Sequence, residues 1–366
     1  MILDSFLVRN FRILREAHLA LDRGVHLFLG LNAQGKTSLI EAILFLATST
    51  SHRTHREEEL IGWGEETAYL RGELTGENEK TTLECGLEKN RKIIKIDGSV
   101  IPRVGDLYGR MRTVLFAPED LTIVGGSPQD RRRFLDMAIA QLEPDYIPLL
   151  HHYRKALRQR NGVLKRLQQS ADSAVRRELA VWDQPFLEYA SRVNFRRCET
   201  IRQLAPLLRE FYDGLAEDGP FSVKLTFGEG MKESEIREAL RQRLERSRAA
   251  EIERGSAQTG PHRDDLVFTM KEKNLSFYGS QGQKRTAALA LRLAESRLGF
   301  ERTGSRPLLL IDDVVHEMDN IRRARFWDLM DFSGQSIVTA TDRDHLGPRL
   351  EPTFVFQVNH GEIRSD

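Results

Sequence analysis

Short apolar runs separated by turn signals dominate the first third of the chain. Turn signals include Gly76-Glu77-Asn78 and Asp97-Gly98. Such runs predict β-strands, because strand side chains alternate between the two faces of a sheet. The runs lie at residues 7–8, 25–29, 67–74, 81–87, 92–96 and 114–116. We therefore expect a sheet here, interrupted by one helix over residues 38–47.

Between residues 130 and 253 the apolar residues recur every three or four positions, which places them on one face of a helix. This face holds Leu149, Tyr153, Ala156, Leu157, Val163, Leu164 and Leu167. Strand-like runs return at 266–268, 308–311, 336–340 and 354–358, with an alanine- and leucine-rich helical run at 286–293. The pattern predicts an α/β fold in which both chain ends build one domain. We expect that domain at residues 1–125 and 255–366, with a helical arm inserted at 126–254.

The most specific motif is Gly30-Leu31-Asn32-Ala33-Gln34-Gly35-Lys36-Thr37, a complete G-x-x-x-x-G-K-[ST] phosphate-binding loop between a strand and a helix. Gly30 and Gly35 let the backbone turn its N–H groups inward, toward phosphate oxygens at the helix N-terminus. We expect Lys36 to neutralise β/γ-phosphate charge and Thr37 to hold Mg²⁺. The motif predicts a nucleoside triphosphate site.

A second element of an NTPase site is the aliphatic run 307–311, which ends in Asp312 and Asp313. Such a run is typical of a buried strand whose acids emerge at its C-terminal edge. Asp312 is expected to orient Mg²⁺ and Asp313 to polarise the attacking water. Buried strands also end in acids without any nucleotide, but the complete P-loop in the same chain favours the catalytic interpretation.

The run Ser280-Gln281-Gly282-Gln283 stands at the start of the helix that contains 286–293. It offers a hydroxyl, two amides and free backbone N–H groups to an anion. An ordinary helix cap is the better explanation of the run when it is taken alone. Its place just before the acidic strand favours a role at the nucleotide.

The order of P-loop, Ser-Gln-Gly-Gln, Asp-Asp and Met318-Asp319 resembles the ABC-type ATPase head of the SMC-like group. Further stretches from end to end are similar to the RecF family of bacterial DNA replication and repair proteins. They are residues 10–12, 51–54, 116–121, 126–136, 259–265 and 279–286. The resemblance implies an ABC-type P-loop ATPase head with an inserted α-helical arm, which binds ATP and Mg²⁺. In that group, signature residues such as Ser280 cover the γ-phosphate on a second protomer, and Asp319 belongs to the D-loop.

The function that the resemblance implies is ATP-dependent DNA binding in recombinational repair and replication-fork maintenance. An ATP-induced homodimer is expected to clamp DNA at gaps, to hydrolyse ATP slowly, and to support recombinase loading and SOS induction with RecO and RecR. The chain departs from the family at Leu31, which contributes only backbone to a phosphate cradle. It also departs at His316, which is either a solvent-facing residue or one that tunes dimer closure. Thr339-Ala340-Thr341 stands where transporter ATPases carry a switch histidine, in keeping with slow hydrolysis.

The overall charge does not indicate a partner, since 55 Lys and Arg nearly balance 54 Asp and Glu. Residues 154–209, however, hold 13 basic and five acidic side chains. This segment suits a phosphate backbone, although a solvated helical hairpin fits the same composition. The candidate DNA contacts are Arg131, Arg132, Arg154, Lys155, Lys165 and Arg166. No base-reading motif is visible, so binding of single-stranded, double-stranded or gapped DNA is expected to depend on charge and shape. We expect residues 259–264 to lead from the arm back into the sheet, with Arg263 near nucleotide or DNA.

Two isolated cysteines, Cys85 and Cys198, indicate a reducing compartment, and no signal peptide or 18-residue apolar run is present, so we expect a cytoplasmic protein. Three alternatives remain. A transporter ATPase subunit is disfavoured by the distant signature and the basic segment. A nuclease lacks an acidic cluster beyond Asp312 and Asp313. A non-hydrolysing DNA scaffold shares every motif and differs only in ATP turnover.

Overall fold

The computed structural model describes residues 1–76, 79–170, 172–314, 318–346 and 350–365, which form two compact units. The head unit comprises Met1–Leu121, Glu210–Asp218 and Arg285–Asp366, and the arm unit comprises Thr122–Arg209 and Gly219–Lys284. Residues 255–284 therefore belong to the arm unit, whereas the sequence pattern placed them with the head. The reason is a small sheet of the arm unit, in which these residues supply two of the three strands.

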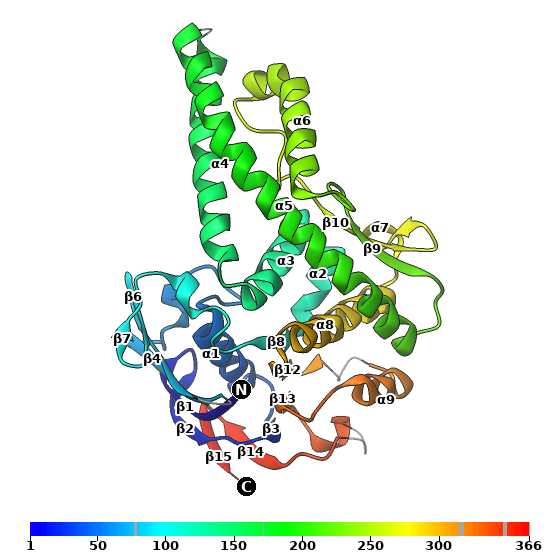
Figure 1. The fold of residues 1–366 in the computed structure, drawn as a ribbon. Coiled ribbons are helices and arrows are strands. Elements are labelled where there is room, and N and C mark those ends of the chain that lie inside the picture. Colours follow the sequence, from blue (N-terminus) through cyan, green and yellow to red (C-terminus); the bar gives the residue numbers. More distant parts are fainter. Residues whose placement is uncertain (77–78, 171, 315–317, 347–349, 366) are drawn as a thin grey trace. The chain divides into compact units, whose positions relative to one another are not determined.

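Two six-stranded sheets form the head unit (Figure 1). The first is antiparallel, with the strand order β2 (Leu14–Ala20), β1 (Ile2–Phe11), β4 (Thr67–Thr75), β5 (Lys80–Glu88), β6 (Arg91–Ile96) and β7 (Ser99–Val100). The second has the order β15 (Glu362–Ser365), β14 (Phe354–Asn359), β3 (Gly24–Leu29), β13 (Gln335–Ala340), β12 (Leu308–Asp312) and β8 (Thr113–Phe116). Its strands are parallel except β15, so the ends of β3, β13, β12 and β8 meet at one edge.

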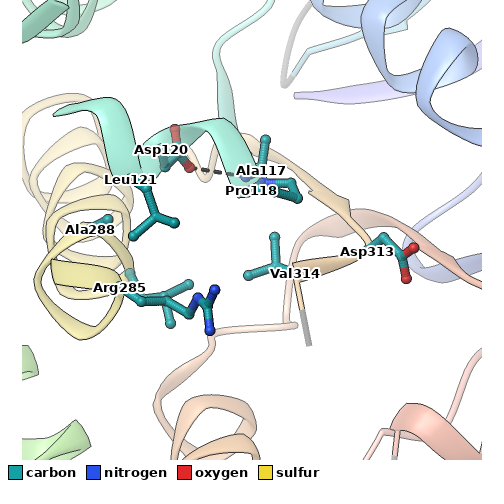
Figure 2. Close-up of a pocket in the computed structure, with 9 residues that line it drawn as sticks. Ala117, Pro118, Asp120, Leu121, Arg285, Ala288, Asp313 and Val314 are labelled. Carbon is teal, nitrogen blue, oxygen red and sulfur yellow. Dashed lines mark hydrogen bonds between the residues drawn. The ribbon is translucent and has the colours of Figure 1, made fainter. Parts of the chain in front are cut away.

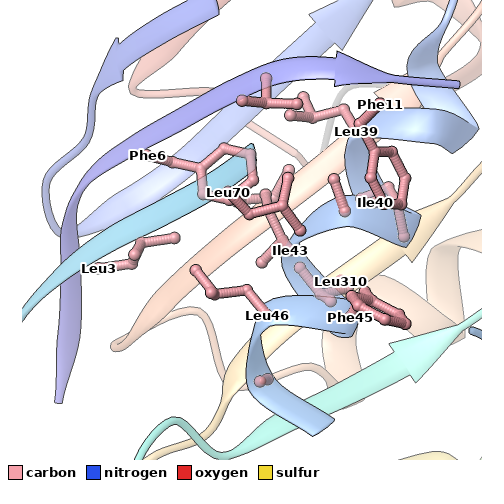
Figure 3. Packing of buried hydrophobic residues seen from close by; sticks show 14 of the residues in the cluster. Leu3, Phe6, Phe11, Leu39, Ile40, Ile43, Phe45, Leu46, Leu70 and Leu310 are labelled. Atoms are coloured by element: carbon pink, nitrogen blue, oxygen red, sulfur yellow. The ribbon is translucent and has the colours of Figure 1, made fainter. Parts of the chain in front are cut away.

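Helix α1 (Lys36–Thr48) contacts strands of both sheets and is buried on nearly all of its faces. A helix that is apolar all round is expected in such a position, because it has no solvent-facing side. Its side chains Leu39, Ile43 and Leu46 pack with Phe6 and Leu70 of the antiparallel sheet (Figure 3). This core holds the helix that follows the phosphate-binding loop.

The remaining head elements lie around these sheets. They are the short 3₁₀ helices η1 (Glu57–Leu60), η2 (Val104–Leu107), η3 (Pro118–Asp120) and η5 (Arg343–Leu346), and the helix α9 (Asn320–Leu329). Helix α8 (Gln281–Thr303) begins in the arm unit and has most of its length in the head unit. Within the described ranges, no helix is both long enough and apolar enough to cross a membrane.

The arm unit is mainly helical and carries one small sheet. Its helices are α2 (Leu121–Gly125), α3 (Pro128–Leu142), α4 (Tyr146–Gln169), α5 (Ser173–Leu215), α6 (Glu233–Arg254) and α7 (Leu275–Tyr278). The antiparallel sheet has the order β11 (Lys273–Asn274), β10 (Leu266–Met270) and β9 (Phe221–Leu225). Val163, Leu164, Leu167, Leu179 and Ala257 form a buried cluster between α4, α5 and the segment after α6.

The apolar pattern predicted the fold class and most elements, and the α/β class is confirmed. The expected strands at 25–29, 67–74 and 81–87 are present, and α8 covers the expected helix at 286–293. The pattern missed β2, β9 and β15, which are short or largely exposed on one side. Residues 259–264 do lead into a strand, but that strand is β10 of the arm unit, because β10 pairs with β9.

Candidate nucleotide site, signature helix and basic arm

The phosphate-binding loop connects β3 to α1 in a conformation that glycine makes possible. Gly35 caps the helix with φ at +116°, a value that residues with a side chain rarely adopt. Gly30 lies so close to β14 that an added Cβ would be 2.3 Å from the Val358 carbonyl oxygen. The loop therefore has no room for a larger residue at Gly30, and its backbone at Gly35 is left-handed.

Lys36 folds back over the loop, with its Nζ donating to the carbonyl oxygens of Gly30 at 2.5 Å and Leu31 at 3.1 Å. Burial lowers the pKa of Lys36, while the carboxylates of Asp313 and Asp312 act in the opposite direction. Burial outweighs the two carboxylates, and a bound phosphate would add negative charge that favours the ammonium form.

Asp312, at the end of β12, is brought to the loop by the order of the sheet. Its Oδ1 accepts hydrogen bonds from the Thr37 hydroxyl at 3.2 Å and the Thr339 hydroxyl at 2.7 Å. Burial raises the pKa of Asp312, and the two hydroxyl donors oppose that change. Carboxylate and hydroxyl oxygens are ligands that Mg²⁺ prefers, so Thr37 and Asp312 fit the ion that the motif implies.

Asp313 follows at the same edge, with a left-handed backbone at φ +51°. Its N–H donates to the Thr339 hydroxyl oxygen at 3.1 Å, so Thr339 of β13 contacts both acidic residues. Thr339 lies between the two motifs because β13 separates β3 from β12 in the sheet. The sequence pattern singled out this threonine only as a substitute for a switch histidine and missed its contact with Asp312.

A second group missed at the sequence level is the β14–β15 turn, which supports the loop through Gln34. The His360 N–H donates to the Gln34 Oε1 at 2.7 Å, and the Gly361 N–H donates to the Gln34 carbonyl oxygen at 2.9 Å. These residues are more than 300 positions apart in the chain, so no local pattern could have shown the contact. The turn holds the loop at the residue just before Gly35.

The stretches 10–12 and 51–54 meet at Glu41, a fully buried carboxylate of α1. Arg12 donates to both of its oxygens at 2.9 and 3.0 Å, and the Ser51 hydroxyl donates at 2.5 Å. Burial alone raises the pKa of Glu41, but the bonds from Arg12 and Ser51 outweigh it and leave the pKa lowered. These two family-like stretches therefore stabilise α1 and the loop that precedes it.

A small pocket lies beside Asp313 in the head unit (Figure 2). It is lined by Ala117, Pro118, Asp120, Leu121, Arg285, Ala288, Leu289, Asp313 and Val314. Figure 2 shows Arg285 and Val314 pointing into this pocket. Asp120 has a structural role, because it accepts a hydrogen bond from the Ala117 N–H at 2.9 Å and forms an ion pair with Arg292 at 2.6 Å.

The signature residues form a capping box at the start of α8. The Ser280 N–H donates to the Gln283 Oε1 at 3.0 Å, and the Gln283 N–H donates to the Ser280 Oγ at 3.2 Å. Ser280 is exposed, as are Phe277 and Tyr278 just before it. The start of α8 is therefore an ordinary helix cap that is also exposed, and its binding of a phosphate stays a prediction.

The D-loop candidate Asp319 caps α9, since its Oδ1 accepts from the Arg322 N–H at 2.9 Å. Ile321, two residues further on, is exposed. His316 lies outside the described residues, so its expected role stays a prediction.

Helix α4 of the arm unit carries a group of exposed basic residues and no acidic residue. Arg154, Lys155, Lys165 and Arg166 are exposed there, together with Arg158. At 100° per residue these five positions fall within about one third of the helix circumference. Two have acidic neighbours, because Arg166 contacts Glu178 at 2.5 Å and Arg154 lies 3.9 Å from Asp136.

Other arginines expected to face DNA have structural partners instead. Arg131 is buried and donates to both carboxylate oxygens of Asp265 at 2.7 and 2.9 Å. Arg132 is half-buried and donates to the Asp264 carbonyl oxygen at 2.9 Å. The expectation for Arg131 is corrected on this geometry, because its guanidinium is occupied inside the arm unit. Arg160, part of the basic segment, is fully buried as well.

Residues 259–265 are held in place by hydrogen bonds within the arm unit. The Tyr153 hydroxyl lies 2.6 Å from the Nδ1 of His262, whose Nε2 lies 3.2 Å from the Ala257 carbonyl oxygen. Since Nε2 must donate to that carbonyl, the neutral ring accepts from Tyr153 at Nδ1. Burial lowers the pKa of His262 to about 4. Arg263 also donates to the Ala257 carbonyl oxygen at 3.2 Å, so hydrogen bonds within the arm unit account for this stretch.

Cys85 and Cys198 are buried free thiols, and burial raises the pKa of each to about 12. Both are therefore packing residues with little thiolate at neutral pH. In the part of the chain that the structure describes, no group of three or more His, Cys, Asp and Glu side chains is arranged to hold a metal ion.

A P-loop after one strand, an acid at the end of a second and a glycine-containing signature at a helix start define a P-loop ATPase head of the ABC type. Residues 2–364 match the family model described as the RecF/RecN/SMC N terminal domain. A solved Smc head bound to the C-winged helix domain of ScpA superposes with a TM-score of 0.58 at 15% identity, covering 100% of this chain and 97% of that one. That likeness shows the fold.

Relatives with higher sequence identity show which family of ATPase heads this chain belongs to. The DNA replication and repair protein RecF of Halothermothrix orenii is 39% identical over 99% of this chain and 98% of its own length. The RecF of Halalkalibacterium halodurans is 37% identical over 99% of both chains. A solved structure of the recombination mediator protein RecF with ATP in the RecFOR pathway is 32% identical, with a TM-score of 0.89, and covers 100% of this chain and 97% of that one. The chain belongs to the RecF family.

Proposed function

We propose that this chain is an ATP-dependent DNA clamp of recombinational repair, in which ATP binding pairs two copies and closes them on DNA. The observation that carries the proposal is the grouping of Lys36, Thr37 and Asp312 around the phosphate-binding loop. A cation, a hydroxyl and a carboxylate grouped in this way would suit a triphosphate and its Mg²⁺. The solved RecF relative with ATP supports ATP as the nucleotide.

Pairing of two copies is supported by large apolar side chains that are exposed at the phosphate-binding loop, the signature and the D-loop. Leu31 in the loop is 73% exposed, Tyr278 before the signature 74%, and Ile321 after the D-loop 69%. Isolated exposed apolar residues are common, but these three coincide with the segments that a second protomer covers in a nucleotide sandwich. Each would lose contact with water when two heads close over ATP.

In the closed pair, hydrolysis transfers the γ-phosphoryl group to water. The bond between the γ-phosphorus and the bridging oxygen breaks, which releases ADP and phosphate. Asp313 positions the water, while Lys36 and the partner's signature serine stabilise charge on the phosphate oxygens. Thr37 and Asp312 would hold Mg²⁺, which would neutralise part of the phosphate charge when bound. Because the γ-phosphate favours only the closed state, its loss reopens the pair.

ATP-dependent pairing is tested by sedimentation velocity with ATP, ADP and no nucleotide. The wild type is expected to dimerise with ATP alone, and Lys36→Ala to remain monomeric because the phosphate loses its cation. Direct nucleotide-binding measurements on the monomer accompany each run. Dimers of Lys36→Ala that match the wild type in ATP dependence contradict the assignment. Measured turnover with and without DNA separates the clamp from a non-hydrolysing scaffold.

DNA binding is assigned to the exposed face of α4, since it carries five basic residues and no acid. The double variant Lys155→Glu and Lys165→Glu is expected to weaken binding to single-stranded, double-stranded and gapped DNA about equally, because phosphate contacts carry no sequence information. The slope of log affinity against log salt is expected to fall by about two. Arg237→Glu on α6, also exposed, is the matched control and leaves the slope unchanged. An unchanged slope for the double variant excludes α4.

Partner proteins complete the proposal. The RecF relative with ATP is described within the RecFOR pathway, so RecO and RecR are the proposed partners of this chain. The functional consequences, recombinase loading and SOS induction, follow from that assignment.

A further inference from the structure

Trp63 is fully exposed, with a relative accessibility of 103%, at the tip of a turn in the head unit. It stands between Gly62 and Gly64, and an added Cβ at Gly64 would meet nothing within 4 Å. Tryptophan is enriched among the residues at the centres of protein interfaces that contribute most of the binding energy. Its full exposure therefore makes it a candidate contact for a partner protein.

The turn that carries Trp63 is tightly held. Ile61 forms a β-bridge with Phe11, and the Gly62 N–H donates to the Asn10 carbonyl oxygen at 2.7 Å. The Asn10 side chain donates to Glu65 at 3.0 Å, on the other side of the tryptophan. The family-like stretch 10–12 thus anchors both ends of the turn. A side chain displayed on an anchored turn loses little conformational entropy when a partner covers it.

A groove of about 1130 Å³ adjoins the turn, and Trp63 is part of its lining. Its charged lining residues are the acids Glu58, Glu59, Glu65, Glu66 and Glu88 and the basic residues Arg12, Arg56, Lys89 and Arg91. Arg12 is already paired with the buried Glu41, so the five acids face three remaining basic residues. The groove is therefore acidic, which disfavours a nucleic acid backbone.

We propose that Trp63 and this groove form the docking site for a partner protein that presents an apolar pocket flanked by lysine and arginine residues. Trp63 would fill the pocket, and the glutamates around it would steer and orient the basic residues. The site shares no residue with the phosphate-binding loop or the signature. The inference rests on the proposed function only for the identity of the partner, for which RecR and RecO are the probes.

The experiment measures the affinity of purified RecR and RecO for the full chain by biolayer interferometry. The variants are Trp63→Ala, Trp63→Phe and Glu58→Lys with Glu66→Lys. Val100→Ala is the matched control, because Val100 is 62% exposed on the same antiparallel sheet and does not line the groove. Circular dichroism and ATP-dependent sedimentation of each variant verify the fold and the nucleotide site. Oligothymidylate of 30 nucleotides is the nucleic acid probe.

Trp63→Ala is expected to weaken binding of one probe protein by at least about 30-fold, as for the central residue of an interface. Trp63→Phe should retain part of the affinity. The charge reversal should slow association and reverse its salt dependence, because the groove then repels a basic partner. Equal binding by wild type and Trp63→Ala overturns the inference and leaves the proposed function intact. Loss of oligothymidylate binding in Trp63→Ala overturns it in favour of base stacking. Failure of the wild type to bind either protein overturns the inference together with the proposed partners.

Discussion

At the scale of single residues, Thr339 shows how much of the site depends on a side chain that lies outside the phosphate-binding loop and the acidic motif. Its hydroxyl donates to Asp312 and accepts from the Asp313 N–H, so one oxygen orients both acids. A buried group that positions a metal ligand typically changes metal affinity by about 10- to 100-fold when it is removed.

Thr339→Val is therefore expected to raise the Mg²⁺ concentration for half-maximal ATP turnover by about 10-fold, because valine keeps the shape and removes the hydroxyl. Titration of turnover against Mg²⁺ measures this change. Thr339→Ser retains the hydroxyl and is expected to behave as the wild type. A Mg²⁺ requirement that is identical in all three proteins contradicts the positioning role.

Residue type alone does not show which arginines of the basic stretches are available to DNA. Arg131 and Arg160 belong to stretches that look basic in sequence, yet each has carboxylate partners brought from distant segments. Helix α4, by contrast, has five exposed basic residues on one side: Arg154, Lys155, Arg158, Lys165 and Arg166. Exposure depends on packing, which composition does not report.

At the scale of elements, a buried ion cluster joins the long helices of the arm. Arg160 of α4 donates to Asp183 of α5 at 2.8 Å and to Glu251 of α6 at 2.6 Å. Burial acts to lower the pKa of Arg160, but the two carboxylates outweigh it and raise the pKa. Arg248 also pairs with Asp183, at 2.6 Å. The cluster fixes which helix faces meet, because any other register leaves charges buried and unpaired.

Arg160→Met is expected to lower the free energy of unfolding by about 3–5 kcal/mol, since it leaves Glu251 buried without its main cation. Urea denaturation followed by circular dichroism measures the change. Arg158→Met, on the exposed side of the same helix, is the control and should lie within about 0.5 kcal/mol of the wild type. Equal losses in the two variants rule out a stabilising role for the cluster.

At the scale of the whole molecule, the proposed sandwich requires each ATP to contact two copies of the chain. Lys36→Ala removes the loop side of a site, and Ser280→Arg blocks the signature side while leaving ATP binding by the monomer intact. A mixed dimer of these two variants contains one site with both defects and one site with neither.

Neither variant alone is expected to dimerise with ATP, whereas the mixture should recover ATP-dependent dimers through its intact site. Sedimentation of differently labelled variants, mixed in equal amounts, measures the mixed species. Recovery supports completion of the site by the second copy. A Ser280→Arg monomer that has lost ATP binding contradicts it, because the signature would then act within its own chain.

The sequence by itself determined the chemistry of the loop and the α/β class. An eight-residue motif specifies a phosphate cradle locally, since its glycines, lysine and threonine act through the backbone of one turn. The apolar periodicity identified the main strands and helices in the same way, because each element's pattern spans only neighbouring residues.

Only the tertiary structure decided which distant side chains support that chemistry. Three features depend on contacts between positions far apart in the chain. They are the hydrogen bond of Thr339 to Asp312, the support of Gln34 by His360 and Gly361, and the turn of Trp63, which Asn10 holds in place. The same packing assigned 255–284 to the arm unit and buried Arg131 and Arg160. Long-range pairing and burial are properties of the packed chain as a whole, so no local window of residues contains them.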